Sequence, residues 1–176
     1  MWAIIAPGPS LTAELCERVR HLTTIAVCNA YQLAPWADYL AANDASWWRR
    51  HPEAAKFRGR KFSGNEIRDI ERVLPNTYGT SSNSGVLALD LARNLGATEV
   101  LMLGFDMHGS HFFGKYTNGC SNTPPHRRLQ HQQQFRDWAR ANKGIKVWNV
   151  TAGSKLEAFP QVPLREALAS VPQPSL

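Results

Sequence analysis

The chain has few of the features that mark secreted, zinc-binding or membrane-spanning proteins. Its three cysteines are odd in number and show neither CxxC nor Cys/His ligand spacing, which argues against a disulfide framework and a zinc site. No apolar run approaches the roughly 20 residues that a membrane helix needs, and the first residues include no basic leader. We therefore expect reduced thiols, no membrane span and a cytoplasmic location.

Acidic residues are also scarce. The chain has 14 aspartates and glutamates against 20 lysines and arginines, which gives a formal net charge of +6 and a pI near 9.5. This balance favours an anionic partner, such as a nucleotide, a glycan or a nucleic acid, without choosing among them. Basic residues gather at residues 47–51 and 58–61, where a solvated basic face accounts for them as well as a nucleic-acid surface does.

Short apolar runs alternate with helical segments along the chain. The runs at residues 1–6, 24–28, 99–106 and 145–150 are typical of buried parallel strands. Residues 86–95 have apolar side chains on most faces of a helix, and Gly96 follows as a C-cap. We expect an α/β fold: a single-domain, Rossmann-like, mainly parallel sheet flanked by helices over residues 1–170, with a frayed tail at 171–176.

Other segments have weaker patterns. The expected elements are a helix at residues 11–22 capped by Ser10, a strand at 37–42, and helices at 45–57, 66–74 and 127–142. Residues 107–125 are rich in Gly, Ser, Asn, His and Thr, and this composition predicts a mobile lid with few apolar side chains to hold it down. Core packing is the favoured role of Trp36, Trp47 and Trp48, ahead of base stacking.

Two glycine turns stand where loops should enter helices. Gly8 and Ser10 follow the first apolar run, and Ser84 and Gly85 open the helix at residues 86–95. The first amides of a helix lack intrahelical partners and lie at the positive end of its dipole, so such turns suit a phosphate. Asp106 ends an apolar run, at the edge where open α/β sheets bind ligands. The sequence therefore predicts a nucleotide phosphate between the two turns, with Asp106 nearby.

These motifs, in this order, resemble a known family. Residues 4–11, Asn29 with the preceding cysteine, the Ser84-Gly85 turn and residues 104–106 are similar to motifs of the bacterial sialyltransferases of glycosyltransferase family 42. They are also similar to the related domain of unknown function 115, which includes a pterin pyrophosphokinase, and to small phage-encoded proteins of that superfamily. The resemblance extends from residue 1 to about residue 159. It implies that Gly8, Ser10, Asn29, Ser84 and Gly85 surround the cytidine monophosphate (CMP) part of a CMP-linked sugar donor.

The histidines supply candidates for proton transfer, because an imidazole with a pKa near 6.5 titrates close to neutral pH. The resemblance implies a general base in the loop before the penultimate helix, where His126 lies, and His111 is the second candidate. Alternatively, these histidines lie on the surface and have no catalytic role. His108 and His111 could also bind a divalent metal together with Asp106, although their spacing matches no strong metal signature.

We expect a transferase that binds a nucleotide-activated donor, most simply a glycosyltransferase with a CMP-sugar-like donor and an unassigned acceptor. One alternative is metal-dependent pyrophosphoryl transfer, for which Asp44 and Asp106 would hold magnesium. Another is a non-catalytic module that binds a nucleotide or a nucleic acid. A homo-oligomer is compatible with each of these.

Overall fold

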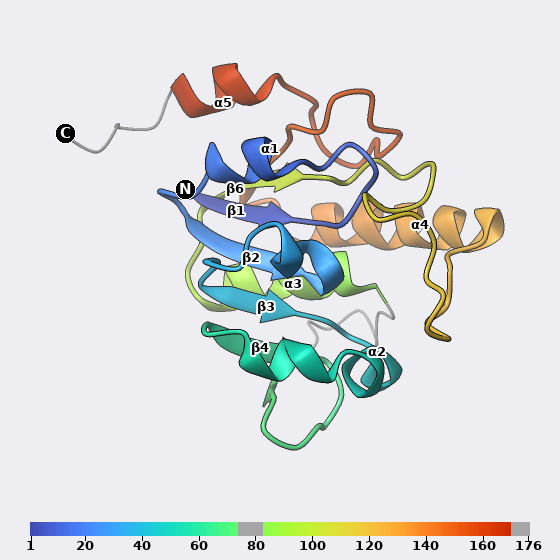
Figure 1. Ribbon diagram of the computed structural model, residues 1–176. Helices are drawn as coiled ribbons and strands as arrows, with labels where there is room; N and C mark the ends of the chain where they lie inside the picture. Colours follow the sequence, from blue (N-terminus) through green and yellow to red (C-terminus); the bar gives the residue numbers. More distant parts are fainter. Residues whose placement is uncertain (74–82, 170–176) are drawn as a thin grey trace.

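The computed structural model describes residues 1–73 and 83–169, so the expected tail at 171–176 lies outside the described residues. Within those ranges, seven parallel strands form one sheet in the order β5-β4-β3-β2-β1-β6-β7 (Figure 1). The strands are β1 (Trp2–Ile5), β2 (Thr23–Val27), β3 (Tyr39–Ala41), β4 (Arg60–Ser63), β5 (Glu71–Arg72), β6 (Glu99–Leu103) and β7 (Lys146–Asn149). The expected α/β, Rossmann-like fold is confirmed.

Helices cover both faces of the sheet. They are α1 (Ala13–Glu17), α2 (Ala45–Arg50), α3 (Ser84–Asn94), α4 (Pro125–Ala141) and α5 (Leu164–Ala169), with 3₁₀ helices η1 (Cys28–Gln32) and η2 (Pro52–Lys56). Residues of α1 and α5 belong to the buried cluster on one face of the sheet, and residues of α3 and α4 belong to the cluster on the other face. In Figure 1, α5 and α1 lie at the top of the view, above β6 and β1. No helix in residues 1–73 and 83–169 is long and apolar enough to cross a membrane.

The central strands are mostly apolar because both of their faces are covered, although β2 begins with two threonines and β6 with Glu99. In β1, Ile4 packs into the core on the side of α3 and α4, while Ile5 packs into the core on the side of α1 and α5. Helix α3 is buried from Gly85 to residue 92, and Gly96 ends it with a φ of +90°. The buried central helix and its glycine C-cap are thus confirmed.

Two expected helices are shorter than their sequence patterns. The helix expected at residues 11–22 contains only α1, and its N-cap is Thr12, whose side chain accepts from Leu15 N. Ser10 is not the cap, because the helix begins only at Ala13, and the Ser10 hydroxyl donates to the distant Asp106. The helix expected at residues 45–57 is divided at His51, where Pro52 begins the separate helix η2.

Three further boundaries differ from expectation. The helix expected at residues 66–74 is wrong where it is described: Ile67 and Ile70 form an isolated antiparallel bridge, and β5 follows. This exposed edge strand has no apolar periodicity, so its sequence carries no strand signal. The N-cap of α3 is Asn83 rather than Ser84, and α4 begins at Pro125, which places His126 inside the helix.

Candidate functional site

The order of the strands reverses between β1 and β6. From β1 the chain moves outward through β2, β3, β4 and β5, and it returns to the other side of β1 at β6. In open α/β sheets, ligands bind beyond the carboxyl ends of the strands at such a reversal. A cavity of about 540 Å³ lies there, lined by residues 6–9 after β1, residues 104–111 after β6 and the first turns of α3 and α4. This cavity is the candidate functional site.

Ser10 and Asp106 fasten one wall of this cavity. The backbone N–H of Ser10 donates to Oδ1 of Asp106 over 3.2 Å, and its hydroxyl donates to Oδ2 over 3.0 Å. Gly8 N donates to Gly104 O over 3.0 Å, and a Cβ on Gly8 would overlap Oδ2 of Asp106. Glycine is therefore required at position 8 so that the turn can lie against β6. Asp106 is buried, and both of its carboxylate oxygens already accept hydrogen bonds from Ser10.

The second predicted turn reaches the same cavity. Asn83 caps α3 by accepting from the N–H groups of Gly85 and Val86, so these amides already have an acceptor. Ser84 Oγ accepts from Asn43 N over 3.0 Å. A Cβ on Gly85 would lie 2.8 Å from the ring of Phe105, so packing requires this glycine. Both turns line the cavity, as predicted, but these named amides donate within the protein and are not presented to a phosphate.

Asn29 is placed elsewhere than expected. It is buried and is not among the described residues that line the cavity. Its Oδ1 accepts from Trp47 Nε1 over 2.8 Å and from the Tyr116 hydroxyl over 2.7 Å. Trp47 and Tyr116 do line the cavity, so Asn29 supports its wall from behind. Burial of Trp47 and Trp48 confirms their expected core role, and Trp36 is half-buried with its Nε1 donating to Glu17.

His51, which the sequence did not single out, completes this network. Its Nδ1 lies 2.9 Å from Trp47 O and therefore donates. Its Nε2 lies 3.3 Å from the amide nitrogens of both Asn29 and Asn118 and therefore accepts. The amide of Asn29 is oriented by Trp47, because an indole N–H can only donate. Asn118 and Tyr116 belong to the expected lid, so the network ties that loop to the sheet.

The two candidate bases line the same cavity. His126 is exposed in the first turn of α4, and His111 is half-buried with its Nδ1 3.1 Å from Gly114 O. The His111 ring stacks on Phe113, with a centroid separation of 4.8 Å. Burial lowers the pKa of His111 below its ordinary value, so the neutral imidazole that a general base needs is favoured at neutral pH.

The cavity wall carries three cationic side chains and the two carboxylates of Asp44 and Asp106. Lys115, Arg127 and Arg128 line it, and Arg128 also donates to Gly109 O. His131 lies one turn further along α4, and burial together with the nearby Arg127 lowers its pKa. Arg127 and Arg128 are adjacent in the sequence, and the fold brings both of them to the carboxyl edge of the sheet. This arrangement attracts an anion.

The residues proposed for a metal site do not form one. Among residues 1–73 and 83–169, no group of three or more His, Cys, Asp and Glu side chains is placed to hold a metal ion. Asp106 uses both carboxylate oxygens on Ser10. The described residues therefore do not fit the metal site considered for Asp106, His108 and His111.

The fold and the cavity together define an α/β protein with a cationic site at the carboxyl edge of a parallel sheet. The chain matches no protein-family model, no curated protein and no solved structure.

Proposed function

We propose that the cavity binds a nucleotide-activated donor and that the protein transfers the activated group, with a CMP-linked sugar as the donor. The observation that carries this proposal is the meeting of Lys115, Arg127 and Arg128 at the cavity beside the strand reversal. Phosphate groups attract such a set of cations. The volume of about 540 Å³ is in the range of small-molecule sites.

The same cavity has groups for the chemistry of glycosyl transfer. An imidazole, from His126 or His111, takes the proton of an acceptor hydroxyl. The acceptor oxygen then forms a bond to the anomeric carbon, and the bond from that carbon to the phosphate oxygen breaks, with its electron pair leaving on CMP. Arg127 and Arg128 stabilise the negative charge on the departing phosphate. Direct attack inverts the anomeric configuration.

Metal-dependent pyrophosphoryl transfer is less well supported. It would need Asp44 and Asp106 to share a magnesium ion, whereas both oxygens of Asp106 accept from Ser10. A non-catalytic module that binds a nucleotide would use the same cationic side chains. It would differ from the proposed transferase only in that it does not turn over the donor.

The test is a thermal shift measurement with CMP, a CMP-linked sugar and cytidine. A ligand at 100 times its Kd stabilises the folded state by about 2.7 kcal/mol. We expect CMP and the CMP-linked sugar to raise Tm, cytidine to raise it less because it has no phosphate, and Arg127→Ala to reduce the response. Arg93→Ala, an exposed arginine of α3 outside the cavity lining, is the matched control. Equal responses to CMP in Arg127→Ala and the unsubstituted protein would contradict this site.

A further inference from the structure

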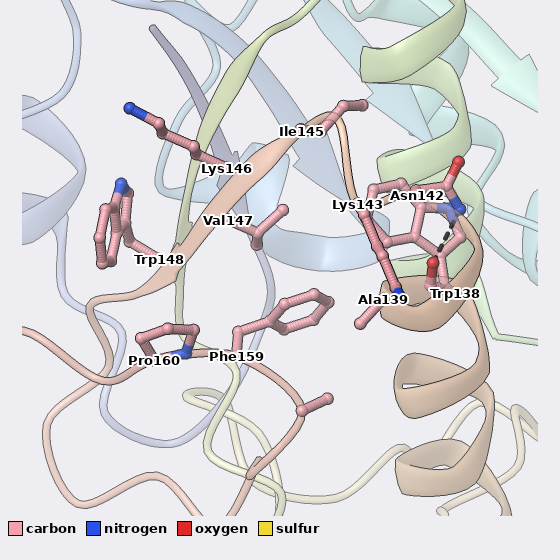
Figure 2. Close-up of a pocket in the computed structure, with 11 residues that line it drawn as sticks. Trp138, Ala139, Asn142, Lys143, Ile145, Lys146, Val147, Trp148, Phe159 and Pro160 are labelled. Carbon is pink, nitrogen blue, oxygen red and sulfur yellow. Dashed lines mark hydrogen bonds between the residues drawn. The ribbon is translucent and has the colours of Figure 1, made fainter.

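A second cavity, of about 410 Å³, opens beside the edge strand β7 (Figure 2). Its walls are the last turn of α4, β7 and residues 158–160. Val147, Phe159 and Trp138 belong to the core on the α4 side of the sheet, whereas Trp148 packs on the opposite side. Figure 2 shows the Phe159 ring extending toward α4, with Trp148 apart from it. We call this cavity the β7 groove.

The outer edge of β7 is only half paired. Lys146 N and Val150 N donate to residues of β6 and its flank, so these alternate residues bond inward. Asn149 faces outward, where its N–H donates to Pro160 O and its carbonyl accepts from Val162 N. Val147 faces outward too. Across residues 1–73 and 83–169, no group is hydrogen-bonded to its outward N–H or C=O.

The rim of the β7 groove is cationic. Lys143 and Lys146 are exposed beside it, and none of the described residues that line the groove is acidic. Two acids lie nearby: Glu99, the cross-strand neighbour of Lys146, accepts from Trp148 Nε1, and Glu157 is paired with Arg136. The groove thus combines an apolar floor, an open backbone position at Val147 and a rim with two exposed lysines.

We infer that the β7 groove docks an extended acidic segment of a partner protein. The segment adds a short strand at Val147, which supplies a backbone donor and a backbone acceptor. Side chains of a strand alternate in direction, so an apolar residue can face Phe159 while the next residue, an acidic one, faces Lys146 on the side of Trp148. Lys143 adds positive charge at the α4 wall of the groove (Figure 2). A second copy of this chain fits less well, because pairing β7 with its own copy would bring like-charged lysines together. This inference is independent of the proposed function.

The test is a selection from a phage-displayed library of random peptides on the full chain, followed by fluorescence anisotropy with the selected peptides. We expect selected peptides to alternate apolar and acidic residues. Ala139→Leu fills the groove from α4, and Lys143→Glu reverses charge at its rim. Each change should weaken binding of the selected peptides by about tenfold or more.

Two matched controls separate docking from general damage. Ala141→Leu alters an exposed position of α4 outside the groove lining, and Lys56→Glu reverses an exposed charge on η2. Both variants should bind the peptides as the unsubstituted protein does. Failure to select acidic extended peptides, or equal binding by Ala139→Leu, would overturn the inference. So would sedimentation showing a dimer that Ala139→Leu dissociates, since the occupant would then be a second copy.

Discussion

The hydroxyl of Tyr116 donates to Oδ1 of Asn29 over 2.7 Å and so joins residues that are 87 positions apart. Through this bond the loop after β6 is fastened to η1 at the end of β2. The expectation that residues 107–125 have few apolar side chains to hold them is wrong, because Phe112 and Tyr116 pack against the core. Closure of this loop over a ligand stays a prediction, and any opening must first break the Tyr116–Asn29 bond.

We expect Tyr116→Phe to lower the free energy of unfolding by about 1 kcal/mol, the usual net value of one hydrogen bond. Asn29 still accepts from Trp47, so the rest of the network stays intact. Hydrogen exchange should speed up over residues 107–124 more than elsewhere. Tyr31→Phe is the control, because the hydroxyl of Tyr31 donates to the exposed Glu53 and not to the loop after β6. Equal effects of the two substitutions on exchange in this loop would contradict the anchoring role.

Gly8→Ala should destabilise the protein by about 1–3 kcal/mol or more, as overpacked sites do. The added methyl group overlaps Oδ2 of Asp106, and the clash pushes the turn away from β6. Gly144→Ala is the matched control, since a Cβ at Gly144 meets nothing within 4 Å. Urea denaturation of both variants measures the difference. If the Gly8→Ala protein were as stable as the Gly144→Ala protein, the turn could shift to accept the added methyl group without loss of stability, and the prediction would be contradicted.

Stability should fall as the pH drops below about 6.5, in part because of His111 and His131. Burial lowers the pKa of both histidines from the ordinary 6.5, so the unfolded chain binds more protons than the folded protein. Their contribution is fully present above the unfolded pKa and is lost as the pH decreases toward the folded pKa. The double substitution of His111 and His131 by Gln should flatten the unfolding free energy between about pH 7 and pH 5.

The control for this pH dependence is His21→Gln, which removes an exposed histidine. Its pH profile should match that of the unsubstituted protein. A steeper slope in the double variant, or no change at all, would contradict the assignment to His111 and His131.

If the protein transfers a sugar from a CMP-linked donor, His126→Ala should lower kcat by about 10²–10⁴-fold while donor binding changes little. The same measurement on His111→Ala distinguishes the two candidate bases, because both imidazoles line one cavity. If only His111→Ala lost activity, His111, in the loop after β6, would be the general base. Full activity in both variants would rule out histidine catalysis at this site.

Local sequence patterns predicted the central helix and five of the seven strands, because buried parallel strands and a buried helix need apolar residues on nearly every face. They missed β4 and β5, the two strands at one edge of the sheet, which are short and carry exposed charged residues. Helix caps were predicted less well. Ser10 has the chemistry of an N-cap, but its hydroxyl is taken by Asp106, which lies 96 positions away. The helix begins three residues after Ser10 with Thr12 as its cap, and a contact between residues so far apart in the chain cannot be found from a local pattern.

The candidate site was predicted in its location and only partly in its contacts. Gly8 and Gly85 do line the cavity, yet the close approach of Asp106 and of Phe105 requires these glycines. Asn29 carried the right chemistry for a ligand contact, but its amide is used by Trp47 and by the Tyr116 hydroxyl. The role of each of these residues depends on which residues the fold brings together. The periodicity of the sequence does not contain that information.

The position of β1 in the middle of the sheet has a consequence for synthesis. This strand is synthesised well before its neighbour β6, because β1 ends at Ile5 and β6 begins at Glu99. At roughly 5–20 residues per second, one edge of β1 waits on the order of ten seconds for its partner. During that interval an apolar strand with open backbone groups is a template for pairing with other chains. A nascent chain that ends before β6 therefore has no cavity and needs a chaperone to stay unaggregated.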